Sequence, residues 1–167
     1  MANDSYKGLL IAILAISAAN LLVSSLQTGM SLRQTSQNAN SAPPAALPSK
    51  YTDALLAQLA TRFTEPYNRG DIDAVYGALD DFAKNQISRS KVAEQMTKLK
   101  DLVGSVDSAS YAGFQKLPGD NGMQLYKLTY SVKLSGGKVP AGVLLITVLD
   151  HPSQPGIVGF FINGVSQ

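Results

Sequence analysis

The strongest constraint on this chain is an uncharged apolar run near its amino end, from Leu9 to Leu26. A helix rises about 1.5 Å per residue, so this run spans roughly 27 Å, close to a hydrocarbon thickness of about 30 Å. A transmembrane helix buries such a run in lipid and satisfies its backbone groups internally. We therefore predict an anchor helix over residues 9–33, with residues 9–26 in contact with the lipid bilayer.

The flanks of this run bear on its orientation. Residues 1–8 form a short tail that carries Lys7 against Asp4, and Arg33 follows the run on the other side. This charge difference is small, but a short tail before a first apolar segment is typical of a single-pass protein that exports its C-terminal part. We therefore expect a cytoplasmic tail, a location in the inner (cell) membrane, and a C-terminal domain in the periplasm or outside the cell.

A cleaved signal peptide is the alternative to an anchor. Lys7 would supply its charged region, residues 9–16 its apolar core, and residues 17–19 its small-residue cleavage site. The apolar residues 21–23 continue the run directly after that site, which a processed N-terminus does not require. We therefore prefer the anchor, and both interpretations export the rest of the chain.

Polar side chains recur along one stripe of the predicted anchor, at Ser17, Asn20 and Ser24. Helical spacing places them on one face. Within a membrane, such a stripe can hydrogen-bond to a second helix, which predicts self-association or docking to an envelope protein. Alternatively, the serines bond to carbonyl groups of their own helix.

Residues 34–49 carry no charge and are rich in Ser, Asn, Ala and Pro, which predicts a linker before one domain at residues 50–167. The chain has 14 basic and 12 acidic residues, evenly spread, so we expect no basic surface for nucleic acid. It has no cysteine, which excludes disulfides, thiolate metal ligands and a cysteine nucleophile.

Apolar residues at helical spacing predict three amphipathic helices in the first half of this domain. Pro66 should kink or end the first helix, Gly70 suits its left-handed C-cap, and Asp71 suits the N-cap of the second. Ser88 opens the third helix, and Gly104 follows it. The apolar positions are Tyr51, Leu55, Leu59, Phe63 and Tyr67 in the first helix, Ile72, Val75, Tyr76, Leu79 and Phe82 in the second, and Val92, Met96, Leu99 and Val103 in the third.

The second half of the domain has the pattern of a sheet. Residues 124–134 alternate apolar and polar side chains, which indicates a strand with one buried face. Pro140 should confine regular pairing to the residues after it, and Gly113 suits a bulge. The four expected strands are residues 106–117, 124–134, 143–149 and 157–165. The expected fold class is α+β, with three helices followed by four antiparallel strands.

One succession of residues runs from the helices into the strands. Its members are Phe63, Tyr67-Asn68-Arg69-Gly70-Asp71, Leu79, Phe82, Leu102-Val103-Gly104, Leu125 to Tyr130 and Gly159-Phe160-Phe161-Ile162. This order resembles the nuclear transport factor 2-like (cystatin-like cone) superfamily, in particular its small bacterial membrane-anchored or exported domains. The resemblance covers about residues 51–165 and implies helices packed on a curved sheet as a cone, with a pocket between them. A single span before such a domain also resembles the inner-membrane scaffold subunit of type IV secretion systems, which is longer.

Catalytic members of that superfamily hold an acid or base inside the cone, commonly an Asp or a His paired with Asp. His151 is the single histidine and follows Asp150 at a strand end, where sequence neighbours point in different directions, so we expect no dyad between them. Asp80 and Asp81 are adjacent on a predicted helix and do not face each other, so we expect both in solvent. One histidine without cysteine is too small a ligand set for zinc. We expect no catalytic residue, no metal and no cofactor.

Three tyrosines are candidates for ligand binding. Tyr126 and Tyr130 lie on the apolar face of their predicted strand, and Tyr76 lies on the second helix. They could line the implied pocket and offer hydroxyl groups to a ligand. Alternatively, their rings fill the core and their hydroxyls bond to the backbone.

These observations predict a single-pass membrane protein with an extracytoplasmic domain that binds or scaffolds without catalysis. The expected partners are a peptide, an envelope component or another copy of the chain. An alternative of a different class is a pocket enzyme, isomerase or dehydratase-like, that acts on a small apolar molecule and requires an acid buried in the cone. A third is a soluble domain released by cleavage.

Overall fold

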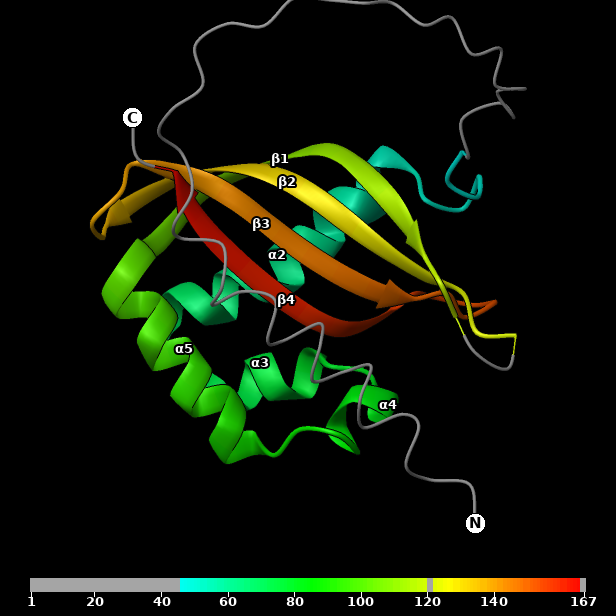
Figure 1. Cartoon of the computed structure of the whole chain (residues 1–167), viewed down its shortest axis with the longest axis horizontal. Helices are drawn as coiled ribbons and strands as arrows, with labels where there is room; N and C mark the ends of the chain where they lie inside the picture. Colours follow the sequence, from blue (N-terminus) through cyan, green and yellow to red (C-terminus); the bar gives the residue numbers. More distant parts are fainter. Residues whose placement is uncertain (1–45, 120–121, 166–167) are drawn as a thin grey trace, which may run out of the picture. The chain divides into compact units, whose positions relative to one another are not determined.

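The computed structural model describes residues 46–119 and 122–165 (Figure 1). The chain from Leu47 onward forms one compact unit. In the described part, four helices precede a four-stranded antiparallel sheet, which confirms the expected α+β class. The helices are α2 (Asp53–Arg69), α3 (Ile72–Ala78), α4 (Asp81–Lys84) and α5 (Arg89–Val103), and the strands are β1 (Gly104–Leu117), β2 (Leu125–Gly136), β3 (Ala141–Leu149) and β4 (Gly156–Val165).

The predicted anchor at residues 9–33 lies outside the described residues, with its polar stripe and with the linker up to residue 45. Across residues 46–119 and 122–165, no helix combines the length and the apolar character that a membrane crossing requires. The end of the linker is described, and there the Tyr51 N–H donates to the Pro48 carbonyl at 2.9 Å.

The boundaries of α2 follow from its capping residues. The Thr52 side chain accepts a hydrogen bond from the Leu55 N–H and so begins the helix. Gly70 ends it in the left-handed conformation, with φ of 70°, and the Asp71 side chain then caps α3, as the sequence predicted. Pro66 does not end the helix, because it lies in the last turn and the chain continues helically to Arg69.

The second predicted helix is wrong in one respect, because it is divided into α3 and α4. Leu79 is extended and forms a parallel bridge with Ile157 of β4. The Asp80 N–H donates to the Ile157 carbonyl at 2.7 Å, and the Asp80 side chain accepts from the Phe82 N–H to begin α4. Hydrogen bonds to β4 thus replace those that would have continued the helix, while Leu79 stays buried.

The sheet is ordered β1-β2-β3-β4, with each strand antiparallel to the next. β3 begins at Ala141, directly after Pro140, as expected from the missing N–H of proline. The register of β1 shifts between Tyr111 and Gly113, which confirms the predicted bulge. A second shift lies between Val106 and Ser108, and no residue pattern there predicted it.

The helices pack against one face of the sheet. Phe63 of α2 contacts Phe160 of β4, with ring centroids 4.2 Å apart. The buried residues of β2 alternate along its length, as the sequence predicted, and each fully buried aliphatic side chain stabilises the fold by roughly 1.5–3 kcal/mol. Fully buried side chains of this core include Leu59, Phe63, Tyr67, Val75, Val92, Leu128, Tyr130, Leu144, Ile146, Val148, Ile157 and Ile162.

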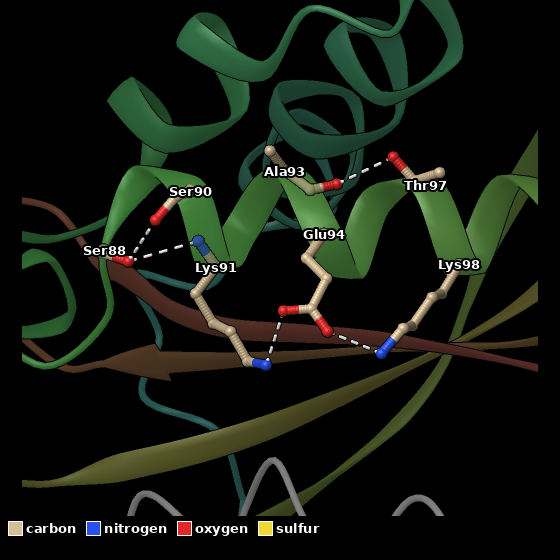
Figure 2. A network of polar contacts seen from close by, with 7 residues as sticks. All are labelled: Ser88, Ser90, Lys91, Ala93, Glu94, Thr97 and Lys98. Carbon is tan, nitrogen blue, oxygen red and sulfur yellow. Dashed lines mark hydrogen bonds and ion pairs between the residues drawn. The ribbon is translucent and has the colours of Figure 1, made fainter.

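One face of α5 packs into the core, and its other face is exposed. The exposed face carries two ion pairs that share Glu94, which we call the ion-pair ladder (Figure 2). Glu94 accepts from the Lys91 Nζ at 2.7 Å and from the Lys98 Nζ at 2.6 Å. Ser88 begins the helix by accepting from the Lys91 N–H. Ion pairs spaced in this way support an exposed helix and leave its other face free for the core.

Candidate functional site

The predicted ligand-binding tyrosines lie in or near the core. Tyr126 and Tyr130 are exposed to only 6% and 1%. The Tyr130 hydroxyl donates to the Leu56 carbonyl of α2 at 2.9 Å, and burial raises the Tyr130 pKa above its ordinary value. Tyr76 is half-buried on α3, with its hydroxyl 3.5 Å from the Lys84 carbonyl. The hydroxyls of Tyr130 and Tyr76 therefore face backbone carbonyls.

The structure also brings five polar side chains together at the turn between β3 and β4. We call them the turn cluster: Lys50, Tyr51, Asp80, Asp150 and His151. They come from three separate segments, which are the first residues of the domain, the α3–α4 corner and the turn itself. Only tertiary folding can unite residues so distant in sequence.

Asp150 binds the two residues that directly follow the linker, Lys50 and Tyr51. Its Oδ1 lies 2.8 Å from the Lys50 Nζ and accepts from the Tyr51 hydroxyl at 2.8 Å. Lys50 also donates to the His151 carbonyl at 2.5 Å. Burial, followed by the hydrogen bond and the charge of Asp150, raises the Tyr51 pKa well above its ordinary value, so this hydroxyl remains a donor. The chain is thereby fixed where it enters the domain.

The Asp80 carboxylate binds the His151 side chain. Its Oδ2 lies 2.9 Å from the His151 Nε2, and its Oδ1 accepts from the Phe82 N–H at 2.8 Å. The Asp80 side chain is only 16% exposed, so the expectation that it lies in solvent is wrong, whereas Asp81 is 95% exposed, as expected. Because a carboxylate accepts, the Nε2 must carry the proton.

A glycine permits this close approach. A Cβ added at Gly156, the first residue of β4, would overlap the Oδ2 of Asp80. Every other residue type would therefore push the carboxylate away from His151. Gly156 is thus part of the local structure that positions the pair.

The chemistry open to this pair depends on what else is near it. A carboxylate that orients an imidazole is the arrangement of a general base, but a base needs a reacting group within hydrogen-bond reach. Among the described residues, the His151 ring bonds to Asp80 and to no hydroxyl group. Nor do three His, Asp or Glu side chains of that part of the chain come close enough to hold a metal ion. The geometry therefore fits a structural role, in which the cluster joins three segments of the chain.

Sequence reasoning missed this cluster for a simple reason. Asp80 and His151 are 71 positions apart, and Tyr51 and Asp150 are 99 apart. One local signal existed, since an aspartate two residues before Phe82 has the pattern of a helix N-cap. That signal would have placed Asp80 at a helix start, but it could not have paired it with His151.

No protein-family model and no curated sequence matches the chain. It is similar to Bd1075 of Bdellovibrio bacteriovorus, with 14% identity over 66% of this chain and a TM-score of 0.39, and it spans 40% of that protein. It is also similar to a proposed aromatic ring hydroxylase of Novosphingobium aromaticivorans, with 11% identity, a TM-score of 0.42, and coverage of 73% of this chain and 94% of the other. Neither likeness carries an argument about function.

Proposed function

We propose that this chain is a single-pass membrane protein whose domain at residues 50–167 lies outside the cytoplasm as a binding or scaffold module without catalysis. Residues 9–26 hold it in the lipid bilayer. Its partner outside is a peptide, an envelope protein or a second copy of the chain. The proposed architecture is the cone of the nuclear transport factor 2-like superfamily.

The composition of the core carries the proposal. Among the described residues, Thr147 is the single buried residue outside the apolar and tyrosine set, and every Asp and Glu is partly or fully exposed. An isomerase or dehydratase acting on an apolar molecule needs an acid or base facing its bound substrate. The apolar character of the buried side chains between helices and sheet supports binding over catalysis.

The irregularities of the sheet support the cone. Bulges bend a strand and increase its local twist. β1 has two register shifts, and the pairing of β3 with β4 has a third, between Thr147 and Val148. Three such points in one four-stranded sheet favour strong curvature around the helices.

Membrane topology tests the proposed location. Alkaline phosphatase, which is active only outside the cytoplasm, is fused after Gln167. We expect active enzyme in the membrane fraction and a chain of uncleaved mass, because residues 9–26 act as an anchor. Removal of residues 9–26 is the control. It should abolish the phosphatase activity and the recovery of the chain in the membrane fraction. Activity of a matched cytosolic reporter alone would contradict the proposal.

Crosslinking in native membranes tests the scaffold role. We expect a discrete adduct that contains this chain and a protein partner or a second copy. The absence of any adduct, together with turnover of a small apolar molecule by the purified chain, would favour the pocket enzyme instead.

A further inference from the structure

The sheet has a second face, which points away from the helices of the described part (Figure 1). On the helix side, Phe160 of β4 contacts Phe63 of α2, and the Tyr130 hydroxyl of β2 bonds to the backbone of α2. Successive side chains of a strand alternate between the two faces. Phe161 and Ser131 therefore lie on the other side, which we call the outer face.

Strand pairing fixes the composition of the outer face. Its four rows, each read from β1 to β4, are Ser108, Lys133, Ala141 and Val165; Ser110, Ser131, Val143 and Asn163; Gly113, Thr129, Leu145 and Phe161; and Gln115, Lys127, Thr147 and Gly159. Ser131, Lys133 and Asn163 are exposed, whereas Thr147 is buried. The rows divide into an apolar half on β3 and β4 and a polar half on β1 and β2.

The apolar half consists of five side chains on two adjacent strands. They are Ala141, Val143, Leu145, Phe161 and Val165. Val165 is 49% exposed, and Val143 and Leu145 are partly exposed and lie outside the apolar core. Apolar side chains gathered on an open face are typical of a surface that contacts a partner or a membrane.

The polar half carries positive charge. The sixteen residues of the outer face include Lys127 and Lys133 and no acid. Among the described residues, no carboxylate forms an ion pair with either lysine. Asp107 places one carboxylate at the rim of this half, where it accepts from the Ser135 hydroxyl at 2.5 Å. The face therefore keeps a net positive charge.

The position and length of the chain before the domain limit what can cover this face. Lys50 pairs with Asp150, whose N–H donates to the Gln124 carbonyl at 2.8 Å, so the chain enters at one end of the sheet. The proposed linker, residues 34–49, reaches at most roughly 53–58 Å at 3.3–3.6 Å per residue. A compact domain of this size has a radius of gyration of roughly 13 Å. An anchor at residues 9–26 therefore keeps the bilayer within reach of the domain at all times.

We infer that the outer face lies on the surface of the same bilayer, with its apolar half at the boundary of the acyl chains and its lysines on anionic phosphate groups. The inference rests on the proposed anchor and deepens the proposed function by giving the domain itself a lipid surface as partner. Apolar side chains beside lysines match that boundary. The tether makes the contact effectively intramolecular, so individually weak contacts suffice. A second copy would present the same positive charge, whereas anionic headgroups complement it.

Quenching by labelled lipid tests this contact, and the absence of cysteine from the chain allows one fluorophore to be placed at one chosen site. The variant Ser131→Cys carries an environment-sensitive fluorophore on the outer face. The full chain is reconstituted into vesicles that contain phosphatidylglycerol and a quencher on the headgroups of both leaflets. The matched control is Thr97→Cys, at an exposed position of α5 on the helix side. We expect quenching at Ser131 to be at least about threefold that at Thr97.

Two results would overturn the inference. One is equal quenching at the two positions, or stronger quenching at Thr97. The other is a Ser131 fluorophore that is already in an apolar environment in detergent micelles and is not quenched in vesicles, because a second copy of the chain then covers the face. The orientation of the chain in the vesicle does not affect the comparison, since both leaflets carry the quencher.

Removal of the two lysines tests the role of charge. Lys127→Gln with Lys133→Gln should lower the equilibrium constant for docking of the domain about fivefold for each lysine, measured by quenching at Ser131. Lys91→Gln with Lys98→Gln on α5 is the matched control, because it gives the same net charge and should leave the quenching unchanged. Salt at roughly 1 M should act as the outer-face substitutions do. Equal effects of the two pairs would contradict the inference.

Failure of this inference can be separated from failure of the proposed function. Flotation with the vesicles reports the anchor, whereas the quenching ratio reports the outer face. A chain that floats but shows equal quenching keeps the anchor and removes the contact with lipid. A chain with a cytosolic reporter result and stronger quenching at Ser131 keeps the contact and removes the extracytoplasmic location.

Discussion

Asp80 shows how one side chain can perform two structural tasks. One carboxylate oxygen caps α4 through the Phe82 N–H, and the other binds His151. An N-cap aspartate contributes through a local backbone bond, whereas the bond to His151 joins residues far apart in sequence. Loss of Asp80 therefore affects both the start of α4 and the turn before β4.

A double-mutant cycle of Asp80→Ala and His151→Ala separates these contributions. We expect a coupling energy of about 0.5–1 kcal/mol, below that of a fully buried charged hydrogen bond, because the His151 side chain is 43% exposed. Urea unfolding followed by tyrosine fluorescence gives the four free energies. The same cycle on Lys91 and Glu94 is the control and should give weaker coupling, since that pair is more exposed. Equal coupling in the two cycles would contradict this account.

The close approach at Gly156 gives a second prediction at this scale. Gly156→Ala should lower the free energy of unfolding by roughly 1–3 kcal/mol, because the new Cβ displaces the Asp80 carboxylate. Gly77→Ala in α3 is the control, since a Cβ there meets no atom within 4 Å. It should raise stability by about 0.4–1 kcal/mol through helix propensity. Thermal unfolding of both variants checks the two signs.

At the scale of an element, α5 shows how charge is confined to one side of a helix. Its buried residues, Val92, Met96, Leu99 and Val103, face the core, and Glu94 lies on the exposed side between two lysines. Hydrogen bonds from those lysines, Lys91 first, lower the pKa of Glu94 to about 2. The folded pKa is below the unfolded one of about 4.3, so the stabilising effect is complete above that pH and is lost as pH falls toward 2.

The pKa of Glu94 can be checked directly by carboxyl NMR during a pH titration. Lys91→Ala or Lys98→Ala should raise this pKa toward its ordinary value, and both together should raise it further. High salt should act in the same direction, because exposed pairs are screened. Lys127→Ala on β2 removes the same charge elsewhere and should leave the pKa of Glu94 unchanged. A value that responds to none of the α5 substitutions would contradict the ladder.

For the domain as a whole, a few polar contacts join the helices to the sheet across large sequence separations. The Tyr130 hydroxyl links β2 to α2 over 74 positions, and the Tyr67 hydroxyl donates to the Gly104 carbonyl at the start of β1. Burial raises the pKa of Tyr67 to about 12, so it stays a donor at neutral pH. These bonds fix how the helices lie on an otherwise apolar interface.

Tyr130→Phe tests this role and bears on the candidate ligand site. We expect the free energy of unfolding to fall by about 0.5–1.5 kcal/mol, because one buried hydrogen bond is lost without a change of shape. Tyr76→Phe is the matched control and should cost less, since its hydroxyl lies at 3.5 Å from its acceptor and is less buried. Chemical denaturation of both variants measures the difference. A Tyr130→Phe variant of unchanged stability would favour a hydroxyl reserved for a ligand.

Local chemistry allowed much of the fold to be predicted. The caps at Gly70, Asp71 and Ser88, the end of pairing at Pro140 and the alternation along β2 each depend on residues near in sequence. The break between α3 and α4 at Asp80 was not predicted, because the apolar residues keep helical spacing on both sides of it. Only the hydrogen bonds of Leu79 and Asp80 to Ile157 favour the extended conformation there.

By itself, the sequence determined which segments are helix or strand and which of their faces are buried, since hydrophobic period and capping act within a few residues. The tertiary structure alone decided that Asp80 would meet His151, that Asp150 would hold Lys50, and that Asn68 would occupy one end of the β1 edge. Such contacts form only when folding brings together segments that are tens of residues apart in the sequence. Polar partners at that range leave no periodic signal in a sequence.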